Sequence, residues 1–201
     1  ILEGLDHSLL LDGRLVPHRF MLTATRTPES MNEFKILSAP VETGWNLLSF
    51  PLVFDDTSAL TVVGSSFSPV QYFGGRYYSN ESSDIEPGSA YWVMSNDESH
   101  IEVSGRTLEG TDSVSVPLSR GWNAVGSPFE EGISVADISI SDGDTELSFQ
   151  DAVSGGWIMA GIYEYTDGSY REMGSPEFFS PFRGYFVRAG KEGLAMVFNR
   201  E

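Results

Sequence analysis

The chain of 201 residues carries 29 Asp and Glu residues against 12 Lys and Arg residues, a formal net charge of −17 at pH 7. This excess of negative charge disfavours DNA, RNA and anionic lipid as partners. The lack of cysteine excludes disulfides, thiolate metal sites and cysteine nucleophiles. No apolar run approaches the roughly 18 residues of a membrane span, so we expect no membrane insertion.

The basic residues are strongly biased towards arginine, because only Lys35 and Lys191 are lysine. Many carboxylates with little lysine suit a protein that stays soluble in high salt, where charge repulsion is screened. An acidic extracellular protein from a GC-rich genome would show the same bias. The composition therefore leaves a halophilic source and an ordinary extracellular one open.

The N-terminal segment, residues 1–31, contains apolar runs at 9–11 and 20–24 that predict two strands around the turn at Asp12 and Gly13. We expect this segment to be the end of a preceding domain or an added edge of the next unit. The start at Ile1 lacks a signal-peptide pattern, and we expect a processed chain or a segment of a longer protein.

An internal repeat organises the rest of the chain. Residues 37–52 align without gaps with residues 114–129, and six of these sixteen positions are identical. Two further blocks recur in the same order. The pattern Tyr-x-x-Gly-x-Tyr occurs at 72–77 and 165–170, and Pro-x-x-x-Tyr-aromatic-Val at 87–93 and 181–187.

These three blocks predict a duplicated unit, with copy one over residues 32–110 and copy two over residues 111–201. The first block repeats after 77 residues and the third after 94 residues. Copy two therefore holds about 17 additional residues, which we place in an insertion around residues 133–161.

Strand signals dominate both copies and predict an all-β fold. Short apolar runs rich in Val, Ile, Tyr and Phe alternate with Gly, Pro, Asn and Asp, and only residues 57–62 and 134–138 favour short helices. We expect two tandem copies of a small antiparallel β unit, sandwich or barrel-like, preceded by a short β hairpin. About 80 residues without disulfides is small for an independent core, so the two copies should pack together.

The middle block of each copy predicts a β hairpin. The pairs Gly74-Gly75 and Asp167-Gly168 tolerate positive φ at both central positions, as a two-residue type I′ turn requires. In the first block, Pro40 and Pro117 cannot donate a ladder hydrogen bond and therefore predict an edge strand or a bulge.

The first block also predicts a structural anchor in each copy. A glycine allows a tight bend, the tryptophan after it is expected in the interior, and the next asparagine is expected to bond nearby backbone. These residues are Gly44, Trp45, Asn46, Gly121, Trp122 and Asn123. In the third block, alternation along the strand predicts that one aromatic of each pair faces inward, with Tyr91 and Tyr185 as anchors, while the other stays near the surface.

The motifs of copy one, Gly-Trp-Asn-Leu-Leu-Ser-Phe-Pro at 44–51 and Pro-Gly-Ser-Ala-Tyr-Trp-Val at 87–93, resemble the tandem GWNLxSxP…PGxxYWV β modules of large secreted bacterial surface proteins. Many such modules occur in proteins resembling type IX secretion cargo of the Bacteroidota and Rhodothermota. Copy two departs from both motifs. The resemblance covers residues 37–201 and implies an extracellular or cell-surface location, but no catalytic residue.

Two candidate sites remain. Tyr78, Trp92 and Trp157 could contribute to an exposed aromatic platform that binds glycans. Three carboxylates at every second residue of the insertion could bind calcium, but they do not match the calcium-binding EF-hand loop, and we favour an acidic turn as their explanation. These carboxylates are Asp142, Asp144 and Glu146.

No catalytic signature is present in the sequence. The histidines His7, His18 and His100 share no metal-ligand spacing, and no nucleophile elbow, zinc-binding helix or phosphate-binding loop occurs. We expect a non-enzymatic structural or interaction module of a larger bacterial surface protein, with other domains or subunits as partners and no cofactor. A carbohydrate- or surface-binding adhesin module and an accessory domain of a secreted hydrolase are the alternatives.

Overall fold

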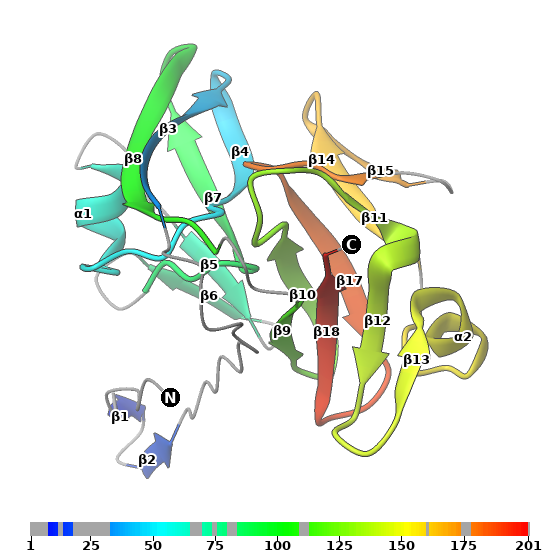
Figure 1. The fold of residues 1–201 in the computed structure, drawn as a ribbon. Helices are drawn as coiled ribbons and strands as arrows, with labels where there is room; N and C mark the ends of the chain where they lie inside the picture. The colour runs from blue at the N-terminus through cyan, green and yellow to red at the C-terminus, as the bar shows by residue number, and fades with distance from the viewer. Residues whose placement is uncertain are drawn as a thin grey trace.

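The computed structural model describes residues 8–11, 14–17, 33–64, 70–73, 76–79, 84–108, 113–159, 161–173 and 178–200 (Figure 1). Strands account for 55% of the structure and helices for 9%, and the strands form several small antiparallel sheets. The all-β class predicted from the alternating apolar pattern is confirmed.

The described part of copy one contains six strands and one helix. Their bounds are β3 (Phe34–Val41), β4 (Gly44–Ser49), α1 (Ala59–Val63), β5 (Val70–Phe73), β6 (Arg76–Ser79), β7 (Ala90–Ser95) and β8 (Ser99–Arg106). Strands β3 and β8 form one sheet, and the second sheet has the order β4-β7-β5-β6. Residues buried between these sheets form the core of copy one. The largest fully buried side chains among them are those of Phe50, Leu52, Ile85 and Tyr91.

Copy two follows the same plan with more elements. It comprises β9 (Ser113–Leu118), β10 (Gly121–Gly126), β11 (Ile133–Ser134), the 3-10 helix η2 (Val135–Asp137), β12 (Ile138–Ser141), β13 (Glu146–Ser148), α2 (Phe149–Ser154), β14 (Tyr163–Thr166), β15 (Ser169–Glu172), β16 (Phe178–Phe179), β17 (Gly184–Ala189) and β18 (Leu194–Asn199). One sheet has the order β10-β17-β14-β15, and another has the order β13-β12-β18-β9. A short pair, β11 and β16, completes the unit.

The strand orders of the two copies correspond. Sheet β4-β7-β5-β6 matches β10-β17-β14-β15 strand for strand, and the pair β3-β8 matches β9-β18. The range in which the insertion is expected, residues 133–161, contains β11, η2, β12, β13 and α2, and of these β12, β13 and α2 have no counterpart among the described residues of copy one. The expected boundaries of the copies, at residues 31–32 and 110–111, lie outside the described residues.

The proline positions and the second hairpin follow the sequence prediction. Pro40 and Pro117 lie in β3 and β9, each the edge strand of its sheet. In the β14–β15 hairpin, Asp167 and Gly168 have φ values of 50° and 73°, as the predicted turn requires. The register of β5 and β6 leaves a two-residue connection, but the turn residues themselves, 74 and 75, lie outside the described residues.

Both predicted helical segments are present, as α1 and η2. The sequence analysis missed α2, which begins after the N-cap Ser148, whose hydroxyl accepts a hydrogen bond from the Asp151 N–H. The segment is short, and Phe149 and Ala152 bury its inner side. A six-residue helix gives too few turns for a periodic apolar signal.

At the N-terminus, β1 (Ser8–Leu11) pairs with β2 (Arg14–Pro17). The first strand is confirmed, whereas the residues directly after the turn, not residues 20–24, form its partner. A two-residue connection is the shortest common one in a β hairpin, and it favours pairing of β1 with the directly following segment over a more distant one. The predicted strand at 20–24 lies outside the described residues.

The two copies pack face to face through their four-stranded sheets (Figure 1). Between these sheets lies an aromatic-rich group of side chains, called here the interface cluster. It consists of Leu47, Ala90, Trp92, Ala124 and Phe186, with Trp122, Tyr163 and Tyr165 partly buried against it. The larger sheets of the described residues therefore stack in four β layers, with a core inside each copy and a third apolar layer between the copies.

Candidate functional site

The asparagine of each repeated Gly-Trp-Asn motif closes the turn before its strand. The Asn46 side chain accepts a hydrogen bond from the Glu42 N–H at 2.8 Å and donates to the carbonyl oxygens of Glu42 and Gly44. The preceding Gly44 has φ of +99°, a conformation that L side chains rarely adopt. The predicted roles of the glycine and the asparagine are confirmed.

Copy two repeats this arrangement. Asn123 accepts from the Ser119 N–H at 2.9 Å and donates to the Ser119 and Gly121 carbonyl oxygens at 2.7 and 2.9 Å. Gly121 has φ of +101°. Since all hydrogen-bonding atoms of the amide group are used locally, these asparagines hold structure and are not presented to a ligand.

The tyrosine of the third block closes a second repeated contact. The buried Tyr91 hydroxyl accepts from the Glu86 N–H and donates to the Asp84 carbonyl oxygen, at 2.9 and 2.8 Å. In copy two, Tyr185 accepts from the Ser180 N–H and donates to the Phe178 carbonyl oxygen. Both tyrosines are interior anchors, as predicted.

Burial sets the protonation of these hydroxyls. Desolvation raises the pKa of Tyr91 and of Tyr185 above the ordinary value of a phenol. The hydrogen bonds that these hydroxyls accept lower the pKa and offset only part of this effect. The hydroxyls therefore remain donors at neutral pH. Desolvation also raises the pKa of Glu86, with a smaller contribution from the negative charge of Asp84.

The prediction that Trp45 is an interior anchor is wrong, because 47% of its surface is exposed. In β4 the residues alternate between the two faces of the sheet: Leu48 joins the core of copy one, whereas Leu47 joins the interface cluster. Trp45 shares the face of Leu47 and lies at the end of the strand, beyond the fully covered part of the cluster. Trp122 is half-buried against the same cluster.

The prediction that the second aromatic of each third block stays near the surface is also wrong. Trp92 and Phe186 are each 7% exposed. Alternation does turn them away from the core of their own copy, but the sheet of the other copy covers that side. The sequence of one copy, taken by itself, gives no signal that the sheet of the other copy covers this face.

The aromatic rings of the interface cluster make edge-to-face contacts that continue to the surface. Trp92 packs against Trp45 at a centroid distance of 6.2 Å and against Tyr165 at 4.7 Å. Tyr165 in turn contacts Tyr170 at 5.3 Å. Since Tyr170 is 58% exposed, the cluster ends in two exposed rings, those of Trp45 and Tyr170.

The predicted glycan platform of Tyr78, Trp92 and Trp157 is not assembled as a set. Trp92 is buried, and Trp157 is half-buried with the Lys191 ammonium 3.6 Å from its ring centre, a cation–π contact. The side chain of Tyr78 lies outside the described residues. The two exposed aromatic side chains at the ends of the interface cluster, Trp45 and Tyr170, were missed because exposure at a strand end depends on the facing sheet.

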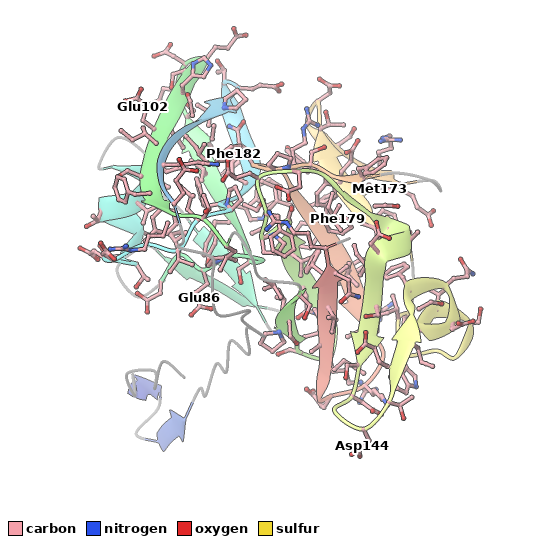
Figure 2. All side chains as sticks on the ribbon, in the orientation of Figure 1. Glu86, Glu102, Asp144, Met173, Phe179 and Phe182 are labelled. Carbon is pink, nitrogen blue, oxygen red and sulfur yellow. The ribbon has the colours of Figure 1, made fainter. Side chains whose placement is uncertain are left out.

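The three carboxylates of the candidate calcium site are directed to different partners. Asp142 pairs with the Lys191 ammonium at 2.8 Å, and that hydrogen bond, followed by the one from the Thr145 N–H, lowers the pKa of Asp142. Glu146 accepts from the Ser139 hydroxyl, and Asp144 lies at the tip of the turn between β12 and β13 (Figure 2). The structure thus favours an acidic turn over a convergent ligand set.

Within the described ranges, no group of three or more His, Asp or Glu side chains is placed to bind a metal ion. No helix in this part of the chain is long and apolar enough to cross a membrane. His100 lies exposed on β8, and His7 and His18 lie outside the described residues. A scan against protein-family models, a search of curated proteins and a search of solved structures each return no match.

Proposed function

We propose that this chain is a non-enzymatic structural or interaction module of a larger, extracellular bacterial surface protein. The observation that carries this proposal is the interface cluster, which makes two small β units into one block through their apolar faces. A module that bears load or spaces neighbouring domains benefits from such a rigid joint, because its units cannot swing independently. The resemblance of residues 37–201 to surface-protein modules supports the same role.

The polar groups of the repeated motifs support it as well. Asn46, Asn123, Tyr91 and Tyr185 all bond backbone within their own turns. Among the described residues, the Thr107 hydroxyl is the single buried side-chain polar atom without a hydrogen-bond partner. The polar side chains of the repeated motifs therefore stabilise turns. In this part of the molecule they do not form the convergent acid, base and nucleophile that catalysis needs.

The test of the mechanical part of this proposal is calorimetry on the whole chain. If the copies form one block, unfolding gives a single transition in which the calorimetric and van't Hoff enthalpies agree. Two separate transitions would contradict a rigid joint. Hydrolysis of any member of a panel of glycosides, esters and peptides with saturation kinetics would overturn the non-enzymatic assignment.

The proposed location has its own test. Antibodies raised against the folded chain should label intact cells of the source organism, and labelling should disappear after mild protease treatment of those cells. Labelling that requires cell lysis would contradict an extracellular or cell-surface location.

A second candidate function is glycan or surface binding by the exposed ends of the interface cluster. Trp45 and Tyr170 are 47% and 58% exposed, and stacking on such rings is a common mode of sugar binding. Saturable binding to a polysaccharide panel that is lost in Trp45→Ala but kept in Met159→Ala would support it. Met159 is a matched control because 57% of its surface is exposed at another place. Equal binding by both variants, or none, would contradict it.

A further inference from the structure

The two copies differ at one sheet edge. In copy two, β18 lies between β9 and β12, whereas the corresponding strand of copy one, β8, forms a ladder with β3 and with no other strand that the structure describes. The other edges correspond: β3 and β9, β4 and β10, and β6 and β15 each end a sheet within the described part of the chain. The free side of β8 is therefore the place where copy two has a strand and the described part of copy one has none.

The register shows which residues are concerned. Pro40 and Pro117 are equivalent in the repeat, and they pair with His100 of β8 and Ala195 of β18. In β18, the strand β12 covers residues 195–198 in antiparallel register. The equivalent stretch of β8 is residues 100–103.

The backbone groups of β8 are directed towards this free side at every second residue. Arg106 and Val53 exchange two backbone hydrogen bonds, of 2.8 and 2.9 Å, on the side of β8 that faces away from β3. Because hydrogen-bonding direction alternates along a strand, Ser104, Glu102 and His100 point the same way as Arg106. No strand in the described part of the chain pairs with β8 at these three residues.

Helix α1 does not replace the missing strand. Ala59 of α1 is separated by 77 residues from Ala136 of η2, the offset of the first repeated block, so α1 corresponds to η2. In copy two, η2 and β12 occur together. The buried α1 residues Ala59, Val62 and Val63 join the core of copy one, and α1 lies beside β8 without forming a strand pair with it.

We propose that the free edge of β8 binds an extended segment of another protein chain, antiparallel to β8, as an added strand. The role of β12 shows the chemistry of such a segment. In the sequence Ile-Ser-Ile-Ser of β12, Ile138 and Ile140 are buried against the sandwich and the serines alternate with them. An alternating apolar and small polar segment is therefore the matching partner, as in other cases of strand addition.

The charge around β8 adds a second requirement. Glu102 is exposed on the outer face of β8, at the side of the molecule away from copy two (Figure 2). A hollow of about 450 Å³ at the beginning of β8 is lined by the carboxylates Glu42 and Glu98 and by His100, and none of its described lining residues is lysine or arginine. Since the whole chain has a net charge of −17, a segment with flanking lysines or arginines fits this edge best.

This inference rests on the proposed role as an interaction module and names its partner surface. The experiment uses the full chain and a labelled probe peptide, Lys-Lys-Ile-Ser-Ile-Ser-Lys. A matched control peptide carries N-methyl groups on the amides that would bond β8. We expect saturable binding by fluorescence anisotropy, protection of the Glu102 and Ser104 amides from hydrogen exchange, and affinity weaker by about tenfold or more for the N-methylated peptide.

Two variants of the protein sharpen the test. Glu102→Pro removes an outward N–H that β3 does not use, and Glu102→Lys reverses the charge; each should weaken probe binding by about tenfold. Asp144→Lys makes the same charge change on the distant β12–β13 turn and should leave binding unchanged. If Glu102→Pro does not fold, Glu102→Lys and the N-methylated peptide still decide.

Failure to saturate at millimolar probe, equal binding of the N-methylated peptide, or exchange protection at an edge other than β8 would overturn the inference. These outcomes leave the non-enzymatic assignment standing, because that assignment is tested separately by turnover of substrates.

Discussion

Ser49 and Gly126, equivalent residues of the two copies, meet each other between the facing sheets. A Cβ atom built on Gly126 would lie 2.1 Å from the Cβ of Ser49, so the two positions accept one side chain but not two. The Ser49 hydroxyl donates to the Arg183 carbonyl oxygen at 2.9 Å, and the Gly126 N–H donates to the Gly88 carbonyl oxygen at 3.0 Å. The contact therefore lies near a pseudo-two-fold axis. The equivalent residues of the two copies must differ there, because the space holds only one side chain.

Gly126→Ser should therefore destabilise the protein, because two serines would overlap at this contact. We expect a loss of about 1–3 kcal/mol in the free energy of unfolding, measured by urea denaturation. The exchanged pair Ser49→Gly with Gly126→Ser keeps one side chain at the contact and should recover part of that loss, because the new Cβ still lies 2.9 Å from the Arg183 carbonyl oxygen. Gly132→Ala, where the nearest atom would be 3.6 Å away, is the control. No recovery in the double variant would contradict the pseudo-two-fold contact.

Gly184 and Ala90 form a second contact between equivalent residues. A Cβ on Gly184 would lie 2.7 Å from the Ala90 Cβ and 2.5 Å from the Leu47 side chain. Gly184→Ala should lower the melting temperature in differential scanning calorimetry, and adding Ala90→Gly should restore part of it. Strictly additive effects of the two substitutions would show that these residues do not share one space.

The two repeated asparagines, Asn46 and Asn123, should contribute unequally to the free energy of unfolding. Asn46→Ala and Asn123→Ala each remove three hydrogen bonds to backbone, but Asn123 is only 2% exposed, whereas Asn46 is half-buried. Backbone groups left unpaired in a buried turn cost more than those that water can reach. We expect about 2–3 kcal/mol for Asn123→Ala and a smaller loss for Asn46→Ala by chemical denaturation. Equal losses would contradict this assignment of burial.

The half-buried position of Glu86 predicts that the stability of the fold depends on pH. Desolvation, with the Asp84 charge, raises its pKa in the folded state above the unfolded value, so the folded protein binds this proton more tightly. Its contribution to stability is therefore complete below the unfolded pKa and is lost as the pH rises through the folded pKa.

Glu86→Gln should accordingly raise the melting temperature at pH 7 and change it little at acidic pH, where the native carboxyl is already protonated. Thermal unfolding between pH 3.5 and pH 7 measures the difference, and Glu98→Gln, at an exposed carboxylate, is the control. A larger stabilisation at acidic pH than at neutral pH would contradict the predicted direction.

Local motifs in the sequence determined much of the fold. Positive φ at Gly44 and Gly121, the backbone-bonded asparagines and the Asp167-Gly168 turn follow from residue chemistry that acts over a few positions. The same holds for the all-β class and for the inward tyrosines, because alternation along a strand is a local signal.

Only the tertiary structure decided what covers the second face of each sheet. Trp45 and Trp92 both lie on that face, yet Trp92 is buried by the opposite copy and Trp45 at the strand end is not. The open side of β8 was equally hidden, because pairing of β12 with β18 depends on how distant segments come together. Burial and edge pairing are long-range properties, whereas a single sequence records reliably only what neighbouring residues impose on each other.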